Sequence, residues 1–211
     1  MDGYKGYLIA LEGGEGVGKT TQVARLIKHL KSLGKEVIAV REPGGTEIGE
    51  QVREVVLSNK NTGIKKMTEI FLFQAARAQV YREVIIPALM VGTTIIVDRS
   101  RDSSTVYQGL VRGYDGKIIE MLNDLTTKNI YPDLTLLLDA SVETGTARNR
   151  AAGSVNRLDL KSSDFHQRVR KGYLQLAKEN KGHRWVTINA ELSPDEVEKA
   201  VWAEVEKKLA L

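Results

Sequence analysis

The residues that point most clearly to a chemical function form a glycine-rich segment, GGEGVGKTT, at positions 13 to 21. It matches the phosphate-binding pattern G-x-x-x-x-G-K-[ST], whose backbone N–H groups and following helix N-terminus attract phosphate oxygens. In this pattern Lys19 is expected at the β- and γ-phosphates and the Thr20 hydroxyl at a magnesium ion. A chance glycine-rich turn is disfavoured by the apolar run before the segment and the helical pattern after it. The segment predicts a nucleoside triphosphate site made by Gly13, Gly14, Glu15, Gly16, Val17, Gly18, Lys19, Thr20 and Thr21.

A second group of polar residues follows the apolar run TTIIVD, which ends at Asp98. A carboxylate at the carboxyl end of a parallel strand points into the crevice where ligands bind, so Asp98 can hold Mg2+ through water or cap the next helix. The stretch that follows, RSRDSSTVYQGLVRG, contains Arg99, Arg101 and Arg112 among hydroxyl and amide side chains. Such a set can bind a second phosphate and a base edge, or form a solvated polar loop.

A third candidate is the stretch VREPGGTEIGE, in which Arg41 and Glu42 come before a sharp turn through Pro43, Gly44 and Gly45. The Pro-Gly-Gly sequence predicts the turn itself. The turn either brings Arg41 to the phosphate of an acceptor molecule or has a purely structural role.

A fourth candidate, ARNRAAGSVNRLDL, carries Arg148, Arg150 and Arg157 around small residues. We expect a mobile lid at about 148–160 that closes over the triphosphate, supplies cations that the glycine loop lacks and excludes water. Arginine charge of this kind is worth on the order of 10³- to 10⁵-fold in rate in other phosphoryl transfer enzymes. An exposed basic loop or a nucleic-acid patch is the alternative.

Short apolar runs that alternate with helical segments must position these residues. The runs YLIAL, EVIAV, TTIIVD, LTLLLDA and WVTIN are typical of buried parallel strands at 7–11, 36–40, 93–98, 134–140 and 185–189. Helices are expected at about 19–33, at 67–90 and from Ser193, where Pro194 and Glu196 complete a capping box. The fold class is therefore α/β, with a five-stranded parallel sheet and helices on both faces.

Composition limits the remaining possibilities. A chain of 211 residues with 42% hydrophobic and 27% charged residues fits one globular domain, 1–211. The net charge of +4 is mild, and small polyanionic molecules explain it as well as nucleic acid does. The absence of cysteine excludes disulfides and thiol chemistry, and the five-residue run near the N-terminus is too short for a signal or a membrane span. We expect a cytoplasmic protein with no membrane association.

Taken in order, these segments resemble one family closely, the bacterial-type thymidylate kinases of the P-loop nucleoside monophosphate kinase group. The motifs that carry the resemblance are LEGGEGVGKTTQ, VREPGGT, LFQAARAQ, VDRSRDSSTVYQG, YPDLTLLLDA and VNRLDLKSSDFHQRVRKGYLQLA. The resemblance spans nearly the whole chain. It implies a P-loop NTPase-type three-layer sandwich that transfers a phosphoryl group from ATP to dTMP with Mg2+ as cofactor, and so feeds dTTP synthesis for DNA replication. It also implies a homodimer.

The resemblance assigns roles on the phosphate and sugar side of dTMP. Glu15 would reach the sugar, Arg41 and Arg99 would hold the monophosphate beside Pro43, and Tyr107 would lie under the deoxyribose, leaving no room for a ribose 2′-hydroxyl.

On the base side, the resemblance places Phe73 against the thymine ring and Arg77, one helical turn on, at a base carbonyl. Ser104 and Gln108 resemble polar base contacts.

On the donor side, family members without an arginine in the glycine loop carry catalytic arginines in the lid, and Gly16 makes this chain one of that kind. Arg148, Arg150 and Arg157 are then ATP contacts. The catalytic set is Lys19, Arg99, Arg150 and Glu15.

Two departures from the family pattern stand out. Ser100 replaces the usual aromatic residue or histidine after Asp98-Arg99, and Asn156 replaces the usual aspartate before Arg157. Ser100 affects the packing beside Arg99, where the phosphate of the acceptor is expected, and Asn156 affects closure of the lid.

Three other functions stay open from the sequence. A kinase of the same group acting on another monophosphate differs only in the base pocket, where one methyl group is worth roughly 10- to 200-fold. A GTPase or a nucleic-acid-stimulated ATPase is disfavoured because the chain has no N-K-x-D motif and no aromatic-basic groove pattern. A nucleotide-binding protein without turnover is distinguished only by assay.

Overall fold

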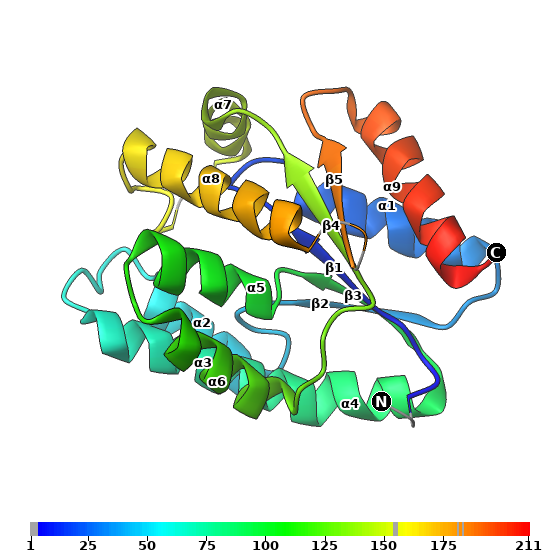
Figure 1. Ribbon diagram of the computed structural model, residues 1–211, viewed down its shortest axis with the longest axis horizontal. Helices are drawn as coiled ribbons and strands as arrows, with labels where there is room; N and C mark the ends of the chain where they lie inside the picture. The colour runs from blue at the N-terminus through cyan, green and yellow to red at the C-terminus, as the bar shows by residue number, and fades with distance from the viewer. Residues whose placement is uncertain (1–3, 154–155, 181, 183) are drawn as a thin grey trace.

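The structure is a computed structural model that describes residues 4–153, 156–180, 182 and 184–211. A parallel five-stranded sheet forms its centre (Figure 1). Its strands are β1 (Leu8–Glu12), β2 (Val37–Arg41), β3 (Thr94–Asp98), β4 (Leu134–Asp139) and β5 (Trp185–Asn189). Their order in the sheet is β2-β3-β1-β4-β5, and every neighbouring pair is parallel. The predicted five-stranded α/β fold is confirmed, with strand ends within about one residue of those expected.

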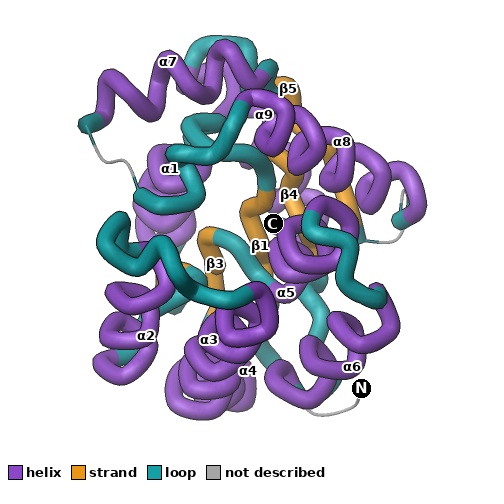
Figure 2. Tube along the Cα trace, turned by 90° about the vertical axis from the view of Figure 1, so that its left-hand side faces the viewer, coloured by secondary structure: helices purple, strands orange, loops and turns teal. Residues whose placement is uncertain are grey.

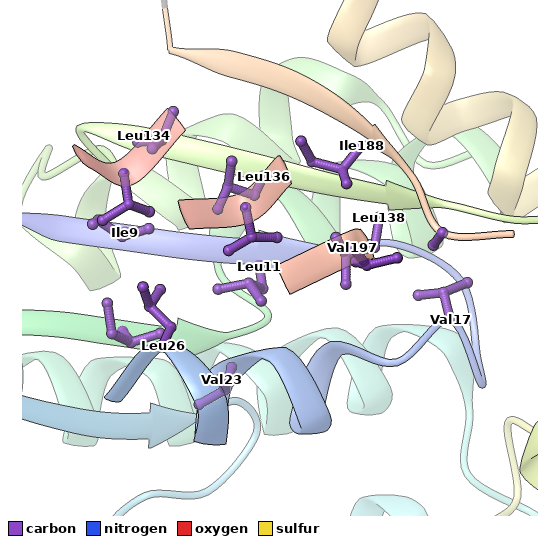
Figure 3. Packing of buried hydrophobic residues seen from close by; sticks show 14 of the residues in the cluster. Ile9, Leu11, Val17, Val23, Leu26, Leu134, Leu136, Leu138, Ile188 and Val197 are labelled. Atoms are coloured by element: carbon purple, nitrogen blue, oxygen red, sulfur yellow. The ribbon is translucent and has the colours of Figure 1, made fainter. Parts of the chain in front are cut away.

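The central strand β1 is buried on both faces because its alternate side chains pack into different cores. Ile9 and Leu11 join α1 (Lys19–Ser32) and α9 (Pro194–Leu209) on one face, as Figure 3 shows. Leu8 and Ala10 point to the other face. Since all four side chains are fully buried, β1 is the central strand that fixes the glycine loop at its end.

The second face is covered by helices from two parts of the chain. One group is α3 (Lys66–Val80), the π-helical turn η1 (Tyr81–Ile85) and α4 (Ile86–Val91). The other group is α5 (Arg101–Ser104), the π-helical stretch η2 (Thr105–Val111) and α8 (Ser163–Glu179). The remaining helices are α2 (Glu47–Leu57), α6 (Gly116–Thr127) and α7 (Val142–Ala152). None of the helices in the described part of the chain is long and apolar enough to cross a membrane.

The helix expected over 67–90 is present, with one widened turn and a buried face that is partly polar. Its turn widens at η1, just before Pro87, which has no N–H for the carbonyl four residues earlier. Its buried face carries Ile70, Gln74 and Arg77, whereas Phe71 is exposed. The polar residues of this face make the wall of a site, so an apolar pattern could not reveal the buried face.

Several candidate site residues lie at the carboxyl ends of the strands, along one edge of the sheet. Arg41 and Asp98 are register partners in β2 and β3, and Asp98 also pairs with Leu11 of β1. Because all strands run the same way, the glycine loop after β1 opens beside the polar segments after β2 and β3. The predicted capping box of α9 is present at Ser193 and Glu196.

Candidate functional site

The glycine loop has the backbone expected for a phosphate cradle. Gly16 and Gly18 have φ values of 67° and 94°, a region that favours glycine. The Lys19 ammonium lies back over the loop, 2.6 Å from the Gly14 carbonyl oxygen and 3.3 Å from that of Gly13. Burial lowers the pKa of Lys19, as does Arg99, against the opposing effect of Glu15. The loop therefore holds a cation and the N-terminus of α1 at the same point, which suits phosphate oxygens.

The loop also contacts the helix that begins the predicted lid. A Cβ atom at Gly16 would collide with the Gly145 carbonyl oxygen, and one at Gly145 would collide with the Glu15 carbonyl oxygen. Two glycines thus let α7 lie directly against the glycine loop. An arginine at position 16 does not fit here, which gives a physical reason for cations outside the loop.

Thr20 and Asp98, the two residues predicted to hold a metal ion, contact each other. The Thr20 hydroxyl donates to Asp98 Oδ2 over 2.8 Å. The described residues include no cluster of three or more His, Cys, Asp or Glu side chains that could hold a metal. A hydroxyl and one carboxylate suit a hard cation such as Mg2+, which keeps several waters and takes the remaining ligands from phosphates.

The region predicted to hold the acceptor phosphate is built around Arg99, which has a φ of 69°. Its Nη2 is 2.8 Å from Glu15 Oε1, and its Nη1 donates to the Gly13 carbonyl oxygen and to the Tyr173 hydroxyl. Tyr107 also donates to Glu15 Oε1, over 2.9 Å. Burial alone would raise the pKa of Glu15, but Arg99, Lys19 and these hydrogen bonds lower it to about 2. Glu15 is therefore an ionised acceptor that links the loop to Arg99 and Tyr107.

Sequence reasoning missed Glu12, the last residue of β1. It is fully buried and accepts hydrogen bonds from the Ser100 N–H and hydroxyl, the Ser103 hydroxyl and the Tyr173 hydroxyl. Burial raises the pKa of Glu12 against the effect of Arg99. An acid that ends an otherwise apolar strand, LIALE, is the signal that could have found it. Ser100, the departure from the family pattern, is accommodated by this carboxylate.

The region predicted to meet the base is a buried polar wall centred on Arg77. Its Nε donates to Glu42 over 2.6 Å, its Nη1 to Ser104 and Asn123 over 2.9 Å each, and its Nη2 to the Ser100 carbonyl oxygen over 3.1 Å. A guanidinium has five N–H groups, so one hydrogen of Nη2 has no acceptor among the described residues. Arg77 also lines the cavity described below, which makes this N–H group a candidate donor to a ligand.

Arg41 lies at the opposite side of the same region. It forms an ion pair with Glu50 at 2.7 Å, and its side chain is half exposed. Arg53, which sequence reasoning missed, donates to the Pro43 carbonyl oxygen over 2.7 Å. Nothing in the pattern of α2 distinguishes Arg53 from a solvated arginine, so only the fold reveals it.

Two cavities adjoin the glycine loop. The larger, about 970 Å³, is lined by loop residues from Glu15 to Thr21 and by predicted acceptor residues. The acceptor residues that line it are Arg41, Pro43, Phe73, Arg77, Arg99, Ser104, Tyr107 and Gln108. The smaller, about 380 Å³, lies between the loop, β4, α7 and α8, and Arg150 lines it. The predicted acceptor and phosphate sites therefore share one cavity.

The three predicted lid arginines have different surroundings. Arg148 donates to the Ala190 carbonyl oxygen over 2.7 Å and lines the larger cavity. Arg150 is exposed and has no hydrogen-bond or ion-pair partner in the described part of the chain. Ser154 and Val155, in the middle of the predicted lid, lie outside the described residues.

The surroundings of Arg157 differ from those expected for a residue that contacts ATP. It is buried, donates to the Val56 carbonyl oxygen and forms an ion pair of 2.7 Å with Glu69. It lines neither cavity. The sequence could not show this, because the partner, Glu69, is 88 residues away along the chain, on α3.

Comparisons with known proteins show which family the chain is similar to. The family model described as thymidylate kinase matches residues 11–201. A curated thymidylate kinase of Trichlorobacter lovleyi is 44% identical over 209 residues, which is 96% of this chain and 98% of the relative. The crystal structure of a thymidylate kinase from Ehrlichia chaffeensis matches with a TM-score of 0.79 and 31% identity, over 95% of this chain and 98% of the other.

Proposed function

The chain belongs to the thymidylate kinase family and phosphorylates dTMP to dTDP with ATP as donor, and from this premise we propose which of its residues do so. One observation supports the proposal above the others. The glycine loop and the predicted acceptor residues line a single cavity of about 970 Å³, so donor and acceptor can meet in it. We propose that the chain works as one domain, 1–211, with a lid at about 148–160.

The reaction needs positioning and charge more than covalent chemistry. An oxygen of the dTMP phosphate attacks the γ-phosphorus of ATP, and ADP leaves. The attacking group is already an anion, so no general base is required. Lys19 neutralises charge on the transferred group, and Arg150 joins it when the lid closes and excludes water.

The residues present fit a magnesium ion. Thr20 and Asp98 would hold it, Thr20 through its hydroxyl and Asp98 through water, with the 2.8 Å contact between them setting the position. When bound, the ion would neutralise charge on the β- and γ-phosphates.

The acceptor is held from three sides. Arg99 and Arg41 bind its monophosphate, with Arg41 released from Glu50, while Pro43 shapes the turn beside them. Glu15 accepts from the sugar hydroxyl, and the ring of Tyr107 lies under the deoxyribose. Both are already joined by a 2.9 Å hydrogen bond, which supports a fixed sugar site.

The base would stack on Phe73 and meet donors and acceptors of the polar wall. Arg77 offers its remaining hydrogen to a carbonyl oxygen of thymine, and Ser104 holds Arg77 in that orientation. Gln108 completes the contact with the base.

On the donor side, Arg148 lines the larger cavity and Arg150 the smaller one, so both reach ATP from α7. Arg157 would contact ATP only after leaving Glu69, and its burial supports a role in holding the end of the lid.

We also propose a homodimer through α3 and α6, which pack side by side (Figure 1). Met67 and Phe71 of α3 and Ile118, Met121 and Leu125 of α6 are exposed at helical spacings. Large apolar groups in such a patch suit a second copy of the chain. Light scattering should give twice the chain mass, and Leu125→Asp should shift it to that of one chain.

The proposed setting is cytoplasmic, with small-molecule substrates and without nucleic acid or membrane partners. The mild net charge of +4 supports this, because no long basic stripe is needed to bind two nucleotides.

A coupled assay of ADP release with ATP and Mg2+ tests the proposed function. Run with dTMP, dUMP, UMP, dCMP and dGMP, it should show dTMP leading by about tenfold or more over each of the others, dUMP included, because one methyl group in the base pocket is worth roughly 10- to 200-fold. Lys19→Ala should abolish turnover, and Lys28→Ala, an exposed lysine on the same helix, should not. Equal rates with UMP and dTMP would contradict the placement of Tyr107 under the sugar.

A further inference from the structure

Glu69 has no part in the function described so far, although it is fully buried in the wall of the base site. Its Oε2 is 2.7 Å from Arg157 Nη2 and 3.1 Å from Arg112 Nη2. Two guanidinium groups thus face one oxygen of this buried carboxylate, and each of the buried charges has a partner there. The second oxygen is therefore free for another donor.

That donor is Gln108. Its Nε2 lies 3.3 Å from Glu69 Oε1. An ionised carboxylate only accepts hydrogen bonds, so it must face the NH₂ end of the amide and not the carbonyl end. The orientation of the Gln108 amide is therefore set by its partner, because the NH₂ group and not the carbonyl oxygen must face Glu69.

The other end of the amide is left for a ligand. Gln108 Oε1 has no hydrogen-bond partner among the described residues, and Gln108 lines the larger cavity. The pocket therefore presents an acceptor at Gln108 and a donor at Arg77, since a guanidinium cannot accept.

We propose that Glu69 is a positioning residue that fixes the Gln108 amide and thereby selects bases with an N–H at position 3. This inference rests on the proposed placement of the base at Gln108. Thymine and uracil have an N3–H donor next to a C4 carbonyl, which match Gln108 Oε1 and Arg77. Cytosine has an N3 acceptor and a C4 amino group, so both contacts would be mismatched and left unpaired.

The experiment compares kcat/KM for dTMP and dCMP in the full chain. In Glu69→Gln the new amide can donate or accept, so the Gln108 amide is no longer held in one orientation. The ratio of dTMP to dCMP should fall on the order of tenfold, mostly through a higher KM for dTMP. A folded variant with the wild-type ratio, checked by thermal melting, would overturn the proposal.

Two further variants distinguish the positioning of Gln108 from a general loss of structure around Glu69. Arg112→Lys disturbs the same ion pair without touching Gln108, so its ratio should stay at the wild-type value; a fall equal to that of Glu69→Gln would overturn the proposal. If Glu69→Gln does not fold, Gln108→Met removes the carbonyl directly and should lower the ratio, whereas an unchanged ratio would refute the role of the amide. Failure of the wild type to use dTMP would instead refute the proposed function.

Discussion

The wall of the acceptor site and the helix that begins the lid differ in how completely their side chains are paired. In the wall, Arg77, Ser104 and Gln108 are buried, and each has a partner from another element. In α7, Gly145 is buried at the glycine loop, but the arginines are exposed and Arg150 has no partner among the described residues. Figure 2 shows α7 at the upper edge of the molecule, away from α3.

This difference suggests a division of work between the two regions. A paired wall keeps its geometry without a ligand, so it can select the acceptor at little cost in ordering. Arg150 has no side-chain partner among the described residues, and the exposed Arg148 donates to one carbonyl oxygen, that of Ala190. Such arginines on an exposed helix can move, so they can deliver charge only when both nucleotides are present. Selection of the acceptor and stabilisation of the transferred group would then depend on different residues.

The largest effect is expected from Arg150→Ala. Loss of a cation used mainly in the transition state should lower kcat on the order of 10³-fold. The KM for dTMP and the melting temperature should hardly change, because Arg150 has no partner to lose. Steady-state kinetics with both substrates will measure this, and Arg150→Lys should restore part of the rate. A parallel rise in the KM for dTMP would contradict the proposal that Arg150 acts on the transferred group and not on acceptor binding.

A smaller effect on rate, but a larger one on stability, is expected from Arg77→Met. It leaves the buried Glu42 carboxylate without its guanidinium, which should cost about 3 kcal/mol of unfolding free energy. The KM for dTMP should rise because the base loses its donor. Urea denaturation and kinetics test both effects. Adding Glu42→Leu should recover stability without recovering the KM; recovery of both would mean that Arg77 acts only structurally.

The smallest effect is a pH dependence at Glu15. Its pKa falls from 4.5 unfolded to about 2 folded, so the stability it provides is complete above about pH 4.5 and is lost as the pH falls towards 2. Between these values the unfolding free energy of the wild type should fall more steeply than that of Glu15→Gln. Denaturation series at several pH values give both slopes, and equal slopes would argue against the Arg99 and Lys19 pairing.

The sequence predicts well those features that depend on neighbours along the chain. The glycine loop, the capping box at Ser193 and the five strands follow from local patterns, and all are present. The Thr20 and Asp98 contact could also be anticipated, because both follow the carboxyl ends of adjacent strands.

Partners far apart in the sequence were not predictable in this way. Arg157 resembles a free lid arginine until the fold brings Glu69 to it. Glu12 resembles the end of a strand until Ser100, Ser103 and Tyr173 converge on its carboxylate. Such choices depend on tertiary packing, which periodicity does not record.

Hydrogen exchange of the free protein, of the dTMP complex and of the complex with dTMP and a non-hydrolysable ATP analogue tests the central claim most directly. Backbone amides of α3 and η2 should exchange slowly in all three states, since the wall is already formed. Amides of α7 should exchange quickly until both nucleotides are bound. Slow exchange of α7 in the free protein, or protection of α3 and η2 only after dTMP binds, would contradict the account.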